Sequence, residues 1–187
     1  MDKVSIENWL KKYEVENYTI NEDMSIDVDG DVDLTDSSLI EIPVKFRSVS
    51  GSFYCYNNLL TSLEGCPEVV NNDFYCYGNQ LTSLLGGPKK VGDFSCSGNL
   101  LTSLEGCPIE VVGDFYCYDN RLTSLEGCYV VDGFFNSKNN NLCEAEVFLY
   151  DCSAEQLSKY YKNKKLHGDL LDGLIEKADV GIKKKKL

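Results

Sequence analysis

Apolar residues recur along the middle of the chain with a period near 20 residues. The segment FYCYGNQLTSL at 74–84 returns with small changes as FYCYNNLLTSL, FSCSGNLLTSL and FYCYDNRLTSL. Aligned on their first apolar residue, the repeats begin at Val32, Phe53, Phe74, Phe94, Phe115 and Phe134. A period of this length is typical of a solenoid, in which each coil buries its apolar side chains against its neighbours.

Within each repeat the pattern is φ-x-Cys-x-x-Asn-x-Leu-x-x-Leu, where φ is an apolar residue. Residues two apart share one face of a strand, so Phe and Cys are expected to point inward and the residues beside them outward. The recurring asparagine is expected to pair turn backbone inside the stack, at Asn58, Asn79, Asn99, Asn120 and Asn139. A glycine closes each coil where the backbone needs unusual angles, at Gly65, Gly86, Gly106 and Gly127.

This pattern resembles the leucine-rich repeat, and residues 91–101 match its eleven-residue core. The short period resembles bacterial members of that family, including effectors delivered by secretion systems, and LTSLEGCP resembles small repeat proteins that bacteriophages encode. The resemblance implies a curved leucine-rich-repeat solenoid with a parallel β-sheet on its concave face, a short irregular convex side, and a role in protein binding. Phe and Cys replace two consensus leucines. In the last copy Asn136 replaces the cysteine and Asn141 takes the first leucine position.

The chain is expected to contain an N-terminal cap at 1–30, an array of about six short repeats at 31–142, and a helical C-terminal cap with a basic tail at 143–187. In the first cap, SIENWLKKY predicts a short helix with Ile6, Trp9 and Leu10 facing inward. INEDMS predicts a hairpin turn. The alternation that follows it, up to Leu34, indicates a strand.

Residues beyond the repeats change character. CEAEVFLYD at 143–151 and two later segments are typical of helices, and Ser153 is a candidate N-cap. The lysine-rich end is interpreted as a solvated tail.

The outward positions of four repeats form the candidate site: Tyr54, Tyr56, Tyr75, Tyr77, Ser95, Ser97, Tyr116 and Tyr118. Two interpretations compete. Strand propensity and cross-strand ring packing favour tyrosine on any exposed strand. Tyrosine also favours interfaces, because it buries a large area and still forms hydrogen bonds. In that case the two serines would form a notch between aromatic walls.

The nine cysteines include two series that follow the repeat, which predicts buried, reduced thiols rather than disulfides or a zinc site. The acidic run DVDGDVD lacks the glutamate that a calcium loop needs at its twelfth position. With one histidine and buried cysteines, the chain offers no catalytic set, so neither enzymatic activity nor a cofactor or metal is predicted.

The chain shows no signal-peptide core and no apolar run of transmembrane length, so a cytoplasmic location without membrane contact is expected.

The formal net charge is −12, so direct nucleic-acid binding is not expected. The first functional hypothesis is a non-catalytic module that binds another protein through the tyrosine-lined sheet. From the bacteriophage resemblance, it would inhibit a host protein. The alternative is an acidic nucleic-acid mimic that blocks a DNA- or RNA-binding protein with Asp27, Asp29, Asp31, Asp33 and other surface acids. A third interpretation is a purely structural or virion-associated part.

Overall fold

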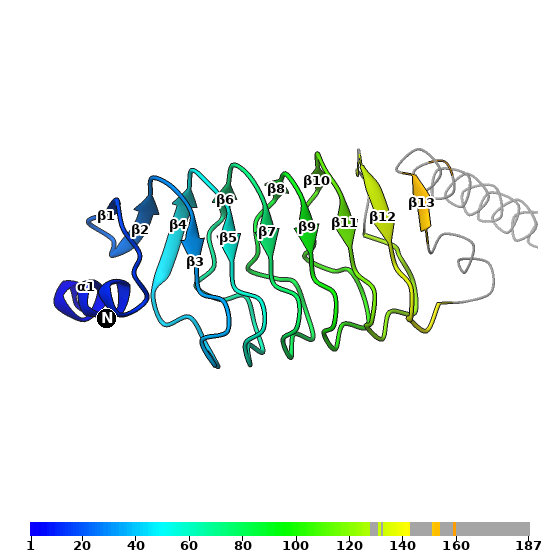
Figure 1. The fold of residues 1–187 in the computed structure, drawn as a ribbon, viewed down its shortest axis with the longest axis horizontal. Helices are drawn as coiled ribbons and strands as arrows, with labels where there is room; N and C mark the ends of the chain where they lie inside the picture. Colours follow the sequence, from blue (N-terminus) through cyan, green and yellow to red (C-terminus); the bar gives the residue numbers. More distant parts are fainter. Residues whose placement is uncertain (128–130, 132, 143–150, 154–158, 160–187) are drawn as a thin grey trace, which may run out of the picture.

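The computed structural model describes residues 1–127, 131, 133–142, 151–153 and 159. Its coils stack in a row into a mostly parallel β-solenoid of about five turns (Figure 1). One strand of each coil joins the seven-stranded sheet β13-β12-β11-β9-β7-β5-β3, and a second joins either the sheet β1-β2-β4-β6 or the pair β10-β8. The return side therefore carries a second row of short strands and is more regular than the sequence predicts.

The strands are short, and most contain two residues. Their bounds in the seven-stranded sheet are β3 Val32–Asp33, β5 Phe53–Tyr54, β7 Phe74–Tyr75, β9 Phe94–Ser95, β11 Phe115–Tyr116, β12 Phe134–Asn136 and β13 Asp151–Ser153. The others are β1 Tyr18–Ile20, β2 Ser25–Val28, β4 Lys45–Val49, β6 Val69–Val70, β8 Lys90–Val91 and β10 Glu110–Val111. Antiparallel pairing occurs between β1 and β2 and between β12 and β13.

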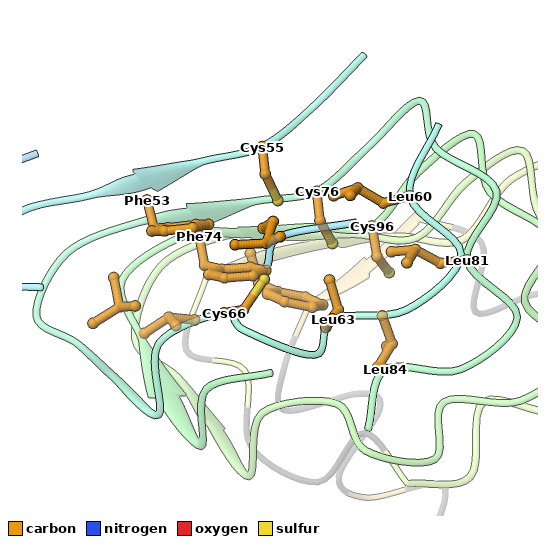
Figure 2. Packing of buried hydrophobic residues seen from close by; sticks show 14 of the residues in the cluster. Phe53, Cys55, Leu60, Leu63, Cys66, Phe74, Cys76, Leu81, Leu84 and Cys96 are labelled. Atoms are coloured by element: carbon orange, nitrogen blue, oxygen red, sulfur yellow. The ribbon is translucent and has the colours of Figure 1, made fainter. Parts of the chain in front are cut away.

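Columns of identical side chains fill the interior, as the alternation of the repeat predicts (Figure 2). Phe74 and Cys76 are fully buried, and each stacks on its counterparts in the neighbouring coils. The Phe74 ring lies 5.5 Å from the ring of Phe53 and 5.9 Å from that of Phe94, in both cases nearly parallel. This continuous apolar strip is what holds a solenoid together, since no coil could bury its apolar face alone.

Buried asparagines join each coil to the one before it, and we call this column the Asn ladder. Asn99 is typical: its Oδ1 accepts the N–H of Leu81 at 2.9 Å, and its Nδ2 donates to the carbonyl oxygens of Cys76 at 3.1 Å and Cys96 at 3.0 Å. The side chain thus satisfies turn backbone that would otherwise be buried and unpaired. The ladder comprises Asn58, Asn79, Asn99, Asn120 and Asn140.

The register of the last coil differs from the prediction by one residue. Phe135, not Phe134, pairs with Phe115 and is fully buried. In consequence Asn140 takes the ladder position predicted for Asn139. Ser137 takes the cysteine position predicted for Asn136, and Leu142 takes the leucine position predicted for Asn141. With two consecutive phenylalanines, the sequence does not decide which one points inward. A shift of one residue in the register exchanges the two faces of a strand.

Directly before each position of the Asn ladder, and before Ser37 at the equivalent position of the first coil, the backbone turns through a left-handed conformation. These residues are Asp36, Asn57, Gly78, Gly98, Asp119 and Asn139, with φ between 51° and 64°. Glycine, asparagine and aspartate tolerate this conformation best, which explains why the position varies only among these three types. Asn139 belongs to this column and so confirms the corrected register.

A second polar ladder runs along the corner that precedes each Phe strand. The Oδ1 of Asp73 accepts the N–H of Asp93, and the Oδ1 of Asp93 accepts the N–H of Asp114, both at 2.8 Å. A glycine in the following coil leaves room for each carboxylate: a Cβ on Gly113 would overlap the Oδ1 of Asp93. We call this column the Asp corner.

The Asp corner has one exception, and it supports the steric explanation. Where the preceding coil carries the smaller Ser52 instead of an aspartate, the following coil carries Asn72 in the place of the glycine. A large residue in one coil is thus followed by a small one in the next coil, and a smaller residue by a larger one.

The N-terminal end contains helix α1, Lys3–Lys12, and the β1–β2 hairpin, both as the sequence predicts. Asp2 caps the helix by accepting the N–H of Ser5 at 2.8 Å. Ile6 and Leu10 are buried, and the edge of the half-buried Trp9 ring faces Phe46 at 6.2 Å, which continues the Phe column.

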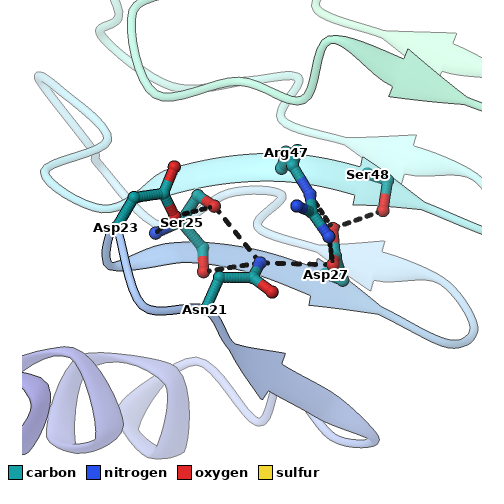
Figure 3. A network of polar contacts seen from close by, with 6 residues as sticks. All are labelled: Asn21, Asp23, Ser25, Asp27, Arg47 and Ser48. Atoms are coloured by element: carbon teal, nitrogen blue, oxygen red, sulfur yellow. Dashed lines mark hydrogen bonds and ion pairs between the residues drawn. The ribbon is translucent and has the colours of Figure 1, made fainter.

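The acidic alternation after the hairpin is not one strand. At Gly30, where φ is 131°, the chain turns a corner and separates β2 from β3, which belong to different sheets. On β2, Asp27 forms an ion pair with Arg47 of the next coil and accepts a hydrogen bond from Ser48 (Figure 3). These hydrogen bonds, that of Arg47 first, hold the pKa of Asp27 well below its usual range.

Protonation of Asp27 is expected to weaken this network. Because its pKa is lowered on folding, its contribution to stability is present above about pH 4 and is lost as the pH falls through the folded-state pKa. Urea denaturation at about pH 6 and about pH 2 should therefore show a smaller acid-induced loss of stability for Asp27→Asn than for the wild type. Equal losses in the two proteins would contradict this role.

Of the segment 143–151, which the sequence predicts to be helical, the structure describes only Asp151, and this residue is not helical. Asp151 lies in β13, which pairs antiparallel with β12, and Ser153 is the last residue of that strand. Apart from Lys159, which is helical, the predicted helices after it and the lysine-rich tail lie outside the described residues. Within the described ranges, no helix is long and apolar enough to span a bilayer.

Candidate functional site

The eight outward positions of four consecutive coils form one surface, which we call the Tyr face: Tyr54, Tyr56, Tyr75, Tyr77, Ser95, Ser97, Tyr116 and Tyr118. Their placement follows from the pleat, since each alternates with a fully buried Phe or Cys. Strand register aligns them in two rows across the sheet, with Tyr75, Ser95 and Tyr116 as neighbours in the first row.

Rings pack across the sheet where tyrosines are neighbours. Tyr56 and Tyr77 stack with centroids 4.3 Å apart and planes within 10°, and Tyr54 lies 5.5 Å from Tyr75. Such cross-strand pairs stabilise a sheet by about 0.2–1 kcal/mol each. Ring packing is therefore part of the reason for tyrosine in these coils.

The coil that begins at Phe94 interrupts both rows. Ser95 and Ser97 occupy outward positions, yet they are 7% and 2% exposed. Their burial differs from the open placement that the sequence suggests, because larger side chains in the neighbouring coils overhang them. A hollow of about 340 Å³ opens above Ser95, lined by Tyr75, Tyr77, Ser95, Tyr116, Tyr118 and Asn136.

Ser97 is the polar group in this region that lacks a partner. Its Oγ is buried and, within the described part of the chain, forms no hydrogen bond. A buried polar group without a partner costs about 1–3 kcal/mol, and such groups are rare in native structures. The same coil thus gives up ring packing in both rows and leaves a hydroxyl unsatisfied.

Acidic residues of the Asp corner orient two of the phenols. The Tyr116 hydroxyl donates to Asp114 at 2.8 Å, and this hydrogen bond is the main cause that raises the pKa of Tyr116 to about 12. The Tyr75 hydroxyl donates to Asp93 at 3.3 Å. Desolvation and these neighbouring carboxylates raise the pKa of Tyr75 well above its usual range. Both phenols are therefore neutral at physiological pH.

A larger groove, of about 870 Å³, lies on the return side near Pro43 and Gly87. Gly87, which lines it, stands where other coils carry a cysteine. Its borders include exposed charged side chains such as Lys45 and Glu68, which pair with each other at 3.8 Å. No buried side chain with an unsatisfied polar atom faces this groove among the described residues.

Six cysteines of the coils are free thiols and buried: Cys55, Cys66, Cys76, Cys96, Cys107 and Cys117. Burial raises the pKa of Cys96 well above its usual range and that of Cys107 to about 12. Thiols of this kind are poor nucleophiles at neutral pH. Among the described residues, no group of three or more His, Cys, Asp or Glu side chains could hold a metal ion.

The four aspartates of the nucleic-acid-mimic hypothesis are divided between two sheets and the corner that joins them. Asp27 lies in the sheet of β2, whereas Asp33 lies in that of β3. Each carboxylate accepts a hydrogen bond within the protein: Asp27 from Arg47, Asp29 from Ser50, Asp31 from the N–H of Ser52, and Asp33 from the N–H of Thr35. These acids therefore contribute to the structure of the first coils.

No protein-family model matches this chain, and comparisons with the curated proteins and with the solved structures likewise found no match.

Proposed function

We propose that this solenoid is a non-catalytic module that binds a partner protein through the Tyr face. The observation that carries the proposal is the pair Ser95 and Ser97 within an otherwise continuous aromatic surface. If the tyrosines served only to stabilise the sheet, the coil at Phe94 would carry them too. Instead, this coil lacks ring packing with both neighbouring coils. Positions at which a sequence departs from the pattern that best stabilises its fold are expected at functional sites.

The chemistry of the face supports binding to protein. Tyr54 to Tyr116 spans three coil spacings, or about 14 Å, and the side chains present both apolar ring surface and polar edges. Rings that pack on each other are already ordered, so that little conformational entropy is lost on binding. The resemblance to leucine-rich-repeat proteins, which bind partners through their parallel sheet, favours the same surface. From the bacteriophage resemblance, the partner would be a host protein that binding inhibits.

Site-specific cross-linking tests this proposal. With photoreactive benzoylphenylalanine in place of Tyr77 or Tyr118, we expect irradiation in an extract of the cells that make the protein to yield one cross-linked partner. The same group in place of Leu85, which is exposed on the return side, should not capture that partner.

A second arm separates docking on the Tyr face from acidic mimicry. The double variant Tyr75→Ser, Tyr116→Ser should lose the partner, and the complex of the wild type should persist in salt that screens surface charges. A complex that dissociates in high salt but survives the double substitution would favour the mimic. Cross-links of equal yield from Leu85 would contradict a site on the Tyr face.

A further inference from the structure

The hollow above Ser95 lies where the neighbouring coils carry a tyrosine ring. Tyr75 and Tyr116 lie on either side of Ser95 in consecutive coils, so their backbones are separated by two strand spacings, roughly 10 Å. A planar group inserted midway would contact a ring on each side at the spacing that the tyrosines of neighbouring coils adopt. The shape therefore favours a flat side chain.

Two phenolic oxygens that line the hollow are available as hydrogen-bond acceptors. The hydroxyl protons of Tyr75 and Tyr116 are donated to Asp93 and Asp114, which leaves the phenolic oxygens to accept. Asp93 belongs to the same coil as Ser95 and lies on the same side of its strand, two residues earlier. Its Oδ1 is taken by the N–H of Asp114, whereas its Oδ2 faces the Tyr75 hydroxyl at 3.3 Å. A ligand that supplies donors and positive charge would complement this set.

The charge at this edge of the sheet is predominantly negative. Asp73, Asp93 and Asp114 lie side by side in the Asp corner. Neither Lys138, which follows Tyr118 along the second row, nor Asp93 lines the hollow itself. Asp93 lies next to it, because its Oδ2 accepts from the hydroxyl of Tyr75, a lining residue. The electron-rich faces of the tyrosines add to the attraction for a cation.

We infer that the hollow binds the guanidinium group of an arginine side chain presented by the partner protein. Guanidinium is planar, permanently charged and rich in donors, so it can stack between Tyr75 and Tyr116 while its N–H groups reach Asp93. The flexible ammonium of lysine matches the charge but not the flat space. The inference deepens the proposed function and rests on it, since it names the group by which the partner is recognised.

A small probe tests the inference without the partner. N-acetyl-arginine amide is titrated into the full chain with ¹³C-labelled tyrosine rings, and the ring resonances are followed by NMR. We expect saturable shifts confined to Tyr75, Tyr77, Tyr116 and Tyr118. The isosteric but neutral N-acetyl-citrulline amide and N-acetyl-lysine amide should bind roughly tenfold more weakly or not at all.

Two variants locate the probe. Ser95→Tyr fills the hollow with the residue that neighbouring coils carry at this position, so the fold should be retained while arginine binding is lost. Asp93→Asn keeps the acceptor for the N–H of Asp114 but removes the charge, and should weaken binding roughly tenfold. Leu85→Ser, on the return side and outside the Tyr face, should leave the affinity unchanged.

Unsaturable shifts, equal affinity for citrulline or lysine, or binding that survives Ser95→Tyr would each overturn the arginine assignment. The outcome is separate from that of the cross-linking experiment. A partner captured from Tyr118 with no arginine binding would leave the proposed function intact and remove this inference. Saturable arginine binding without any cross-linked partner would support an arginine site in the hollow and contradict the docking of a partner protein on the Tyr face.

Discussion

Replacing Asn99 with alanine is expected to destabilise the solenoid by roughly 3 kcal/mol or more. The amide of Asn99 satisfies the N–H of Leu81 and the carbonyl oxygens of Cys76 and Cys96, all of which are buried. Alanine would leave these groups without partners in a position that bulk water does not reach. Urea denaturation followed by far-UV circular dichroism measures the loss.

Gln80 provides the matched control for Asn99. It has an amide side chain of the same chemistry, but it is exposed and precedes Leu81 in the same turn region. Gln80→Ala should change the free energy of unfolding by no more than about 0.5 kcal/mol. If Asn99→Ala were equally mild, the Asn ladder would not be a main source of cohesion between coils.

The Asp corner leads to the second large expected effect. Gly113→Asn should destabilise the protein by about 2–4 kcal/mol, because the new side chain would overlap the carboxylate of Asp93. Asp93→Ser alone should cost about 1 kcal/mol through the weakened hydrogen bond to the N–H of Asp114. The double variant reproduces the Ser52 and Asn72 pairing found two coils earlier and should be more stable than the sum of the single effects predicts.

A double-mutant cycle of urea denaturation curves measures this coupling, which we expect to be about 1–2 kcal/mol in favour of the double variant. Gly92→Ala with Asp73→Ser offers an independent repeat of the cycle, since a Cβ on Gly92 would approach the Oδ1 of Asp73 in the same way. Additive effects in both cycles would show that size matching between coils does not explain these residue choices.

Much of the interior could be predicted because side chains on a strand alternate with a period of two. That period placed Phe53 and Cys55 inside and Tyr54 outside, and the structure confirms each of them. The same rule failed in the last coil, where Phe134 and Phe135 both fit the apolar position. Only pairing with Phe115 resolves the choice.

The polar contacts could not be predicted as well, because each of them depends on residues of a neighbouring coil. The exchange of glycine for Asn72 after Ser52 is visible in the sequence, but its meaning requires knowing that these residues touch. The burial of Ser97 depends on larger side chains in coils about 20 residues away in either direction. Likewise, Asp27 and Asp29 look like a free acidic surface until Arg47 and Ser50 of the next coil are placed beside them.

Completing the interrupted aromatic surface should abolish docking of the partner. In the double variant Ser95→Tyr, Ser97→Tyr the coil at Phe94 carries the same outward residues as the coils on either side. Its affinity for the cross-linked partner is then measured by isothermal titration calorimetry. We predict a protein at least as stable as the wild type that no longer binds. Undiminished affinity in the filled variant would contradict docking of the partner over Ser95 and Ser97.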